Sequence, residues 1–195
     1  EGVRLLPSDN VPVVEKERMP ARQLSGHVLD FGQNMAGIIR FVNRLPKGKT
    51  MRIQTGEVLH DGNFYRDNLR TAKSEYVYTS DGTEKEVEPL FTFFGFRYAK
   101  IEGQETVDPA DFTAVCLSSD LKETLEVRTD HEKLNRLMHD SLWGQRSNFL
   151  DVPTDCPQRD ERLGWTADTQ VFVDTACYQM DCKAFYAKFM RDMHL

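Results

Sequence analysis

The spacing of apolar residues changes near residue 119, and this change constrains the fold more than any other feature of the sequence. Residues 26–118 contain short apolar or alternating segments separated by turn residues, which is typical of antiparallel β-structure. After residue 119 the apolar residues recur at a spacing of about 3.6, which is typical of helices. The sequence therefore predicts an α+β multidomain chain, in which an antiparallel β-sandwich at residues 26–119 precedes helices at residues 120–195.

The β-rich part combines short strands with turns of recognisable chemistry. The segments LPKG at residues 45–48 and SDG at residues 80–82 supply the Pro, Asp and Gly residues that favour turns. Residues 1–25 show no reliable period and are interpreted as a connector from an upstream domain, and residues 60–73 as a long polar loop. We expect strands at residues 27–31, 37–43, 49–56, 74–79, 87–91, 96–102 and 112–118.

The helical part has start and stop signals as well as a period. We expect a first helix from about residue 130 to residue 149, capped by Thr129 or Asp130 and ending before Pro153, because proline removes a backbone donor. A second helix is expected from residue 165 or 166 to residue 179, and a third from Cys182 to the end. The residues expected to face inward are Leu134, Leu137, Met138, Ser141 and Leu142, then Val171, Phe172 and Ala176, then Phe185, Phe189 and Met193.

Composition excludes several classes of function. The formal net charge is -6 and no basic run is present, which argues against a nucleic-acid partner. The sequence has neither an apolar run of about 18 residues, as a membrane span requires, nor the features of a signal peptide, and it is compatible with a cytoplasmic, periplasmic or secreted location. The cysteines match no recognised zinc spacing and are expected to be free, buried thiols.

The densest concentration of reactive side chains lies in the sequence DVPTDCPQRDERLGWTADTQ, residues 151–170. Its two prolines keep the first part extended or turned, so the charged side chains are expected on a loop between two helices. Glu161 could act as a general acid. Trp165 and Asp168 are three residues apart and can share one side of the first turn of the second helix.

This composition suits carbohydrate chemistry. Neighbouring carboxylates and an indole ring raise the pKa of a carboxylic acid, and a donor to a glycosidic oxygen must keep its proton near neutral pH. The flat faces of Trp and Phe stack on sugars, while Asp and Arg bind hydroxyl groups. Two alternatives remain: a structural ion-pair network, in which Arg159 and Arg162 neutralise the carboxylates and Asp168 caps a helix, or a metal site formed by Asp155, Asp160 and Asp168.

The run DVPTDCPQRDERLGWTAD at residues 151–168 closely resembles the signature of the bacterial α-L-rhamnosidase family of glycoside hydrolases. The segments DFGQNMAGIIR at residues 30–40 and FTFFGFRYAKI at residues 91–101 resemble the β-sandwich that precedes the catalytic domain in that family. The resemblance covers most of the chain, from about residue 28 to the end.

The resemblance implies an inverting hydrolase that removes terminal α-L-rhamnose with an (α/α)6 barrel, without a metal or cofactor in the chemistry. Carried over by position, Glu161 is the expected general acid. The resemblance also places four residues in the rhamnose-binding pocket, namely Asp155, Arg159, Trp165 and Asp168.

An inverting mechanism also needs a general base, a second carboxylate roughly 6.5–9.5 Å from the first. In the resembled family this base is a glutamate far downstream, to which no residue here corresponds. We therefore expect a fragment that carries only the acid half of the site, is inactive alone, and self-associates through the incomplete barrel. The competing interpretations are a non-catalytic carbohydrate-binding or scaffold module, and a related barrel hydrolase that acts on another sugar.

Overall fold

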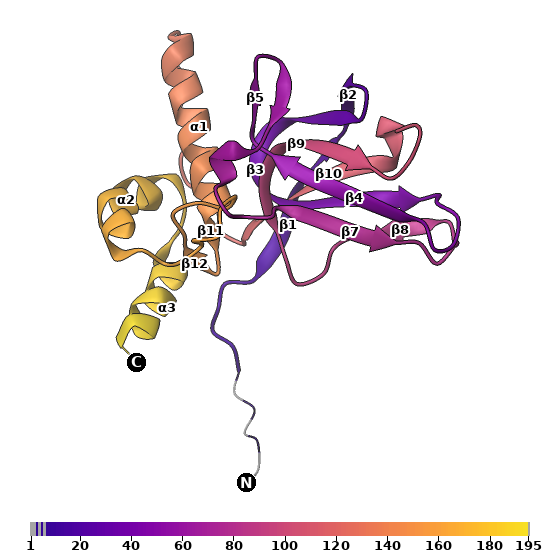
Figure 1. Cartoon of the computed structure of the whole chain (residues 1–195). Coiled ribbons are helices and arrows are strands. Elements are labelled where there is room, and N and C mark those ends of the chain that lie inside the picture. Colours follow the sequence, from indigo (N-terminus) through magenta and orange to yellow (C-terminus); the bar gives the residue numbers. More distant parts are fainter. Residues whose placement is uncertain (1–2, 4, 6, 195) are drawn as a thin grey trace.

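The computed structural model describes Val3, Leu5 and residues 7–194. Residues 1, 2, 4 and 6 of the expected connector and residue 195, the last of the expected third helix, lie outside the described residues. The main sheet occupies one side of the molecule and the helices, with the short strands between α1 and α2, the other, and the first helix packs against the sheet (Figure 1).

The strands are β1 (Val13–Pro20), β2 (Arg22–Ser25), β3 (Val28–Asn43), β4 (Thr50–Gly56), β5 (Val58–His60), β6 (Asn63–Tyr65), β7 (Glu75–Thr79), β8 (Lys85–Val87), β9 (Phe94–Glu102), β10 (Phe112–Ser119), β11 (Phe149–Leu150) and β12 (Val152–Pro153). The helices are α1 (Glu132–Asn148), α2 (Thr166–Gln179) and α3 (Lys183–His194), with short 3-10 turns η1 (Asp67–Leu69) and η2 (Pro109–Asp111).

The main sheet is antiparallel, with the order β1-β10-β3-β9-β4-β7, and β2 and β8 also pair with β3. The sheet curls over its own core. Strands β3 and β7 are separated in the sheet by β9 and β4, yet Phe41 of β3 packs against Tyr78 of β7, with the ring centroids 5.4 Å apart. The same ring also stacks on Phe112 of β10, with the ring centroids 6.1 Å apart. The predicted β-sandwich followed by helices is confirmed.

The core of the sheet is built from apolar side chains of its central strands. Leu29, Ile53, Phe96 and Ile101 are fully buried, and each contributes about 1.5–3 kcal/mol through the apolar area removed from water. Trp143 of α1 belongs to the same cluster and is 8% exposed. The sheet and the first helix therefore share one hydrophobic core.

The structure differs from the sequence-based expectation in three parts of the β-region. The expected connector contains β1, which pairs with β10, and β2, which pairs with β3. The expected polar loop at residues 60–73 includes most of the β5–β6 hairpin and η1. The strand expected at residues 87–91 is instead β8, which ends at Val87, because Pro89 has no amide donor and Phe91 has a φ of 56°.

The helices lie close to their expected positions, but their buried faces differ. The N-cap of α1 is His131, whose Nδ1 accepts a hydrogen bond from the Leu134 amide at 3.3 Å. Leu137 is 62% exposed and Val171 is 86% exposed, contrary to expectation, as are Leu134 and Met193 to a lesser degree. The N-terminal half of α1 extends past the sheet (Figure 1), so its apolar residues lack a surface to pack against within the described part of the chain.

A second hydrophobic cluster holds the helices together. Phe149 and Phe185 stack with their ring centroids 4.6 Å apart, and Leu121, Ala176 and Met180 are buried beside them.

Among the expected free thiols, Cys116, Cys156 and Cys182 are buried, whereas Cys177 is exposed. Burial raises the pKa of the Cys116 thiol to about 12. Across the described residues, every helix is too short or too polar to cross a membrane.

Candidate active site

The acidic loop, residues 151–165, joins α1 to α2 and is fixed at both of its ends. The amide and hydroxyl of Thr154 donate to the Asn148 carbonyl oxygen at 2.8 and 3.0 Å, which folds the loop back onto the end of α1. An isolated antiparallel bridge between Thr154 and Gly164 then closes the loop. The prediction of a loop between two helices at this stretch is confirmed.

Arg159 lies at the centre of the charged residues of this loop. Its Nη2 is 3.1 Å from Glu161 Oε2 and 3.7 Å from Asp155 Oδ2, and its Nε donates to Cys156 Sγ at 3.4 Å. The Cys156 thiol donates to Asp155 Oδ2 at 3.2 Å. The structure thus brings together three of the predicted site residues, Asp155, Arg159 and Glu161, around one guanidinium group.

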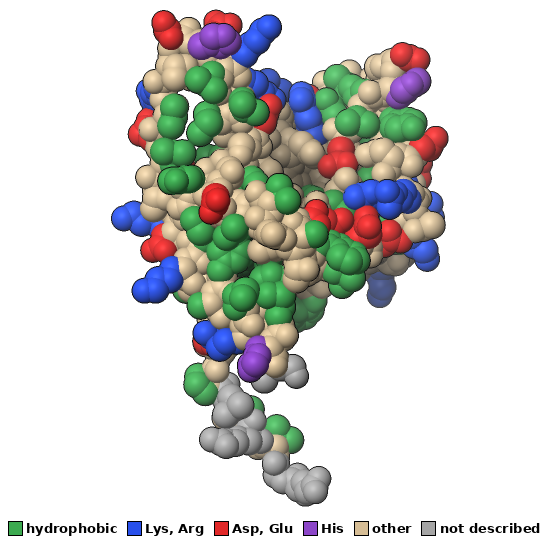
Figure 2. Space-filling view, turned by 90° about the vertical axis from the view of Figure 1, so that its left-hand side faces the viewer, with side chains coloured by type: hydrophobic (Ala, Val, Ile, Leu, Met, Phe, Trp, Pro, Cys, Tyr) green, Lys and Arg blue, Asp and Glu red, His purple; other side chains and the backbone are tan. Residues whose placement is uncertain are grey.

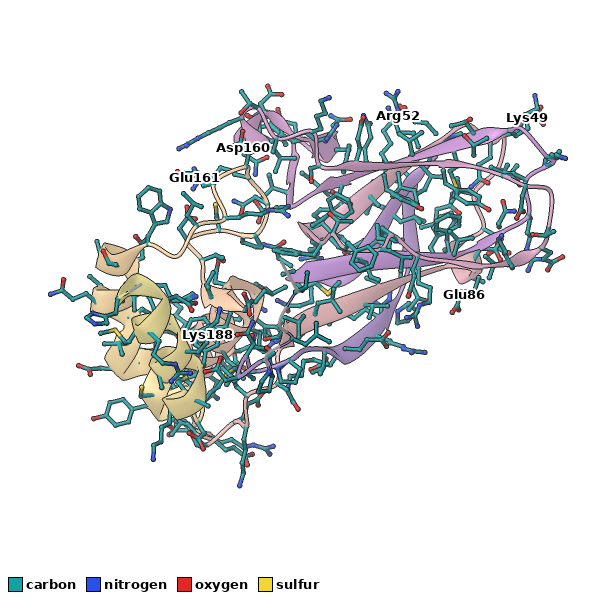
Figure 3. All side chains as sticks on the ribbon, turned by 90° about the horizontal axis from the view of Figure 1, so that it is seen from below. Lys49, Arg52, Glu86, Asp160, Glu161 and Lys188 are labelled. Carbon is teal, nitrogen blue, oxygen red and sulfur yellow. The ribbon has the colours of Figure 1, made fainter. Side chains whose placement is uncertain are left out.

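The sheet half of the molecule also contributes to this cluster. Arg70, which follows η1, places its Nη1 3.5 Å from Glu161 Oε2. Thr71 donates a hydrogen bond to Asp160, and this bond lowers the pKa of the Asp160 carboxyl. Figure 3 shows Asp160 and Glu161 side by side on the loop between the helices and the sheet.

Arg162 has a different role from the one considered in the ion-pair alternative. Its guanidinium carbon lies 4.4 Å from the centroid of the Phe93 ring, and its Nε donates to the Arg159 carbonyl oxygen at 3.1 Å. Burial lowers the pKa of the Arg162 guanidinium. The expected neutralisation of carboxylates is therefore carried by Arg159, while Arg162 anchors the loop to the sheet.

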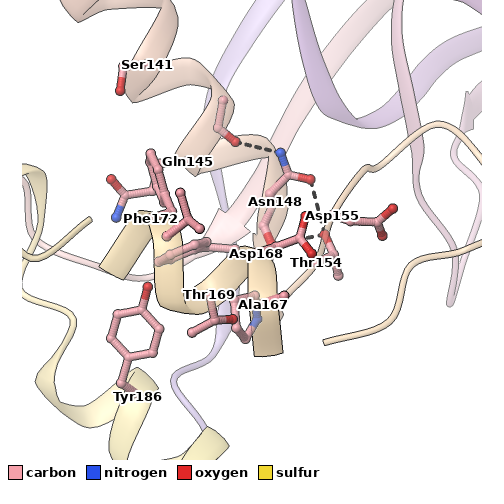
Figure 4. Close-up of a pocket in the computed structure, with 14 residues that line it drawn as sticks. Ser141, Gln145, Asn148, Thr154, Asp155, Ala167, Asp168, Thr169, Phe172 and Tyr186 are labelled. Carbon is pink, nitrogen blue, oxygen red and sulfur yellow. Dashed lines mark hydrogen bonds between the residues drawn. The ribbon is translucent and has the colours of Figure 1, made fainter. Parts of the chain in front are cut away.

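A first cavity, of about 580 Å³, lies among the three helices and the start of the acidic loop (Figure 4). Asp155 and Asp168 both line this helix cavity, whose walls are largely apolar and include Phe149 and Phe172. Asp155 Oδ1, together with Gln145 Oε1 and Tyr186 Oη, is buried here without a hydrogen-bond partner among the described residues. Unpaired buried polar atoms are costly, so they suit a site that a polar ligand completes.

A second cavity, of about 810 Å³, lies between the sheet, α1 and residues 155–159 of the acidic loop. The N-terminal end of α1 and the β5–β6 hairpin project on the same side of the molecule, and Figure 2 shows the surface hollowed between two such projections. This interface cavity shares Asp155, Gly144 and Asn148 with the helix cavity. Arg159 lines it as well.

The other predicted site residues are placed differently. Trp165 is the N-cap residue of α2 and is 44% exposed, and Asp168 follows in the first turn of the helix without capping it. Neither cavity, as the described residues outline them, is lined by Trp165 or Glu161. Sequence reasoning missed Arg70 and Thr71, because their contacts with the acidic loop arise only from the tertiary fold.

One group of side chains has metal-ligand spacing. Ligand atoms of Asp155, Cys156 and Glu161 lie within 4.8 Å of one another, a different set from the Asp155, Asp160 and Asp168 considered from the sequence. The Arg159 guanidinium contacts all three of these side chains and supplies the positive charge at this position. An incoming cation would have to displace it.

Comparison with known families divides the chain into two matched regions. Residues 21–118 match the model described as the bacterial alpha-L-rhamnosidase concanavalin-like domain. Residues 122–195 match the model described as the bacterial alpha-L-rhamnosidase 6 hairpin glycosidase domain.

Individual relatives and solved structures agree with these matches. An alpha-L-rhamnosidase of Streptomyces avermitilis is 41% identical over 93% of this chain and 18% of its own length, and one of Formosa agariphila is 37% identical over 98% and 22%. The crystal structure of the S. avermitilis alpha-L-rhamnosidase complexed with L-rhamnose superposes with a TM-score of 0.90 at 40% identity, covering 95% of this chain and 19% of that one. The chain spans about a fifth of the length of these relatives.

Proposed function

The chain belongs to the bacterial α-L-rhamnosidase family, and on this premise we propose that it forms part of an enzyme that hydrolyses terminal α-L-rhamnosides with inversion of configuration. In this proposal the β-sandwich and the opening helices of an (α/α)6 barrel, divided near residue 119, carry the general-acid half of the site. The substrate is a rhamnose-containing glycoside, and the general base lies outside the 195 residues of the chain.

The observation that carries this proposal is the clustering of Asp155, Arg159 and Glu161 beside two cavities that meet at Asp155. A glycosidase must bind a sugar on one side of the scissile bond and its leaving group on the other, with the acid near the bond itself. In the proposed arrangement, Asp155 and Asp168 bind the rhamnose in the helix cavity that they line, and Arg159, held beside Asp155, and Trp165 reach the sugar from outside its wall. Asp155 Oδ1, which has no partner among the described atoms, accepts from a sugar hydroxyl.

Glu161 is the proposed general acid. It now lies within ion-pair distance of Arg159 and Arg70, at 3.1 and 3.5 Å. Because a general acid must carry a proton to the leaving oxygen, we propose that Glu161 exchanges these pairs for the glycosidic oxygen when substrate binds. Its side chain is 35% exposed, which leaves room for that movement.

The test is Glu161→Gln in the whole protein, measured on a rhamnoside with a sugar leaving group and on 4-nitrophenyl α-L-rhamnoside. We expect kcat to fall by about 10²–10⁴-fold on the sugar glycoside, because its leaving group needs protonation. The nitrophenyl substrate should lose much less, because nitrophenolate departs with little assistance.

Asp160→Asn is the matched control, since Asp160 is the neighbouring carboxylate and pairs with Thr71 rather than with the Arg159 cluster. Near-normal turnover of the sugar glycoside by Glu161→Gln, or an equal loss in Asp160→Asn, would contradict the assignment. The isolated 195-residue chain, which lacks the proposed base, should release no rhamnose.

A further inference from the structure

We infer that the interface cavity binds the leaving group of the substrate, and that this group is an uncharged sugar held in part by Glu57 of the sandwich. The inference rests on the proposed rhamnosidase function and goes beyond it by naming the class of leaving group. It also assigns the sandwich a direct part in substrate recognition.

The position of the cavity fits a leaving group. Asp155 lines both cavities, so ligands in the two cavities meet at one side chain. Arg159 lines the interface cavity and its Nη2 lies 3.1 Å from Glu161 Oε2, so a single side chain separates the proposed acid from this cavity. An acid that protonates a glycosidic oxygen must stand beside the group that departs. The volume of the interface cavity, about 810 Å³, is within the usual range for small-molecule sites.

The sandwich is shaped locally to reach this cavity. The pairing of β3 with β9 shifts between Asp30 and Met35, and the intervening residues Gln33 and Asn34 line the cavity. Glu57 lies between β4 and β5 and lines it as well. The buried rings of Tyr98 and Trp143 form apolar parts of the wall. Aromatic faces and hydrogen-bonding groups together are what a sugar requires.

The charges on the cavity wall are already paired, which favours a neutral ligand. Arg97 forms two hydrogen bonds of 2.9 Å with Asp30, and Arg136 Nε lies 2.9 Å from Asp140 Oδ2. Arg159 pairs with Asp155 and Glu161 of its own loop. An anionic sugar would meet arginines whose charge is already offset by a carboxylate, and would be repelled by the carboxylate of Glu57, which is unpaired among the described residues, whereas a neutral polyol can accept from the guanidinium N–H groups that remain free.

Glu57 is the exception, because it forms no ion pair with any described residue. Its Oε1 accepts from Asn34 Nδ2 at 3.0 Å and its Oε2 from Asn68 Nδ2 at 3.1 Å. Burial raises the pKa of its carboxyl group. Each oxygen keeps a free lone pair, so the side chain is oriented by two amides and can accept from sugar hydroxyls. Gln158 Oε1, buried and without a partner in the described part, offers a further acceptor from the loop.

The test compares two substrates of the whole protein, a rhamnosyl disaccharide with a neutral second sugar and 4-nitrophenyl α-L-rhamnoside. The measured quantity is the ratio of kcat/KM for the disaccharide to kcat/KM for the nitrophenyl glycoside. Glu57→Gln replaces one acceptor oxygen with a donor, and we expect this ratio to fall about tenfold. Glu86→Gln is the control, since Glu86 lies at the opposite end of the sheet from Glu161 (Figure 3) and should leave the ratio unchanged.

A second variant, Val58→Trp, fills the cavity from its rim and tests the same inference without altering a carboxylate. Val58 is 43% exposed, so the larger side chain should not disturb the core, and the ratio should again fall. An unchanged ratio in either folded variant, or a wild-type preference for a disaccharide whose second sugar is a uronic acid, overturns the inference. If the wild-type protein hydrolyses neither substrate, the proposed function itself fails.

Discussion

Gly95 of β9 and Gln158 of the acidic loop are in direct contact. A Cβ atom built on Gly95 would lie 2.7 Å from both the Cβ and the backbone nitrogen of Gln158, closer than real Cβ contacts. Because the opposing atoms include backbone, the loop and not merely a side chain would have to move. The absence of a side chain at this position therefore sets the spacing between the sheet and the loop.

We expect Gly95→Ala to destabilise the chain by about 1–3 kcal/mol, as overpacking typically does. Urea unfolding followed by circular dichroism measures this change. Gly144→Ala is the matched control, because Gly144 lies inside α1 and its added Cβ would meet no described residue outside the helix backbone within 4 Å. The control should gain about 0.5–1 kcal/mol from its higher helix propensity. Equal free energies of unfolding for the two variants would contradict the prediction, because they would show that the loop moves away from the added methyl group at no cost.

The sequence predicts some residues of the candidate site but not the others, and the reason is physical. The prolines and charges of residues 151–168 are contiguous, so the loop and the proximity of Asp155, Arg159 and Glu161 follow from local sequence and resemblance. Arg70 and Glu57 belong to segments about a hundred residues earlier, and only the pairing of strands brings them to the loop. A single Glu after a strand carries no signal of its own.

Among the elements, α1 is joined to the rest of the fold mainly through its last turns. Arg146 Nη1 lies 2.8 Å from Glu17 Oε1 of β1, and its Nε donates at 2.9 Å to Glu123 in the segment before α1. The same guanidinium carbon lies 4.7 Å from the centroid of the Trp143 ring. One side chain thus connects the first strand, the segment between sheet and helices, and α1.

Replacing Arg146 by Met keeps much of the aliphatic stem and removes these ion pairs. Arg146 is 14% exposed but its partners are 40–45% exposed, so solvent screening limits the loss, and we expect about 1–2 kcal/mol. Arg136→Met, which removes an exposed pair four residues apart within α1, should cost no more than about 0.5 kcal/mol. Equal midpoints in urea for the two variants would argue against the connecting role of Arg146.

The elements themselves were predictable where burial produces a regular pattern. The start of α2 and the central strands β4, β9 and β10 lie close to where the period places them. The sequence does not reveal β1, because it is an edge strand with charges on both faces, including Lys16, whose Nζ is 2.8 Å from Asp120. The inward face of α1 was misplaced because only its C-terminal half meets the sheet, through Trp143 and Ser147.

On the scale of the whole molecule, apolar side chains gather on the exposed faces of α2 and α3. Val171 is 86% exposed, Tyr178 74% and Met190 60%, and Phe189, Met190 and Met193 border a small apolar hollow beside α2. Exposed apolar side chains that gather on two neighbouring helices favour association with another molecule.

We therefore expect the 195-residue chain to self-associate as its concentration rises, which analytical ultracentrifugation would measure. The double substitution of Val171 and Met190 by Lys should weaken the association about tenfold or more, since it removes apolar area from the contact. Leu90→Lys is the control, because Leu90 is 69% exposed but lies in the sheet half. A monodisperse monomer at all concentrations would contradict the expectation.

The presence of Trp143 in the core of the sheet bears on how such chains can evolve. The two family regions meet between residues 118 and 122, yet a side chain from the second region completes the hydrophobic core of the first. Recombination at that boundary would produce a sandwich with a cavity where Trp143 packs, or a helix whose Trp143 side chain has no core to pack into. We therefore expect the two regions to be exchanged together, and a sandwich from an unrelated protein to replace this one only if it offered a matching recess for the tryptophan.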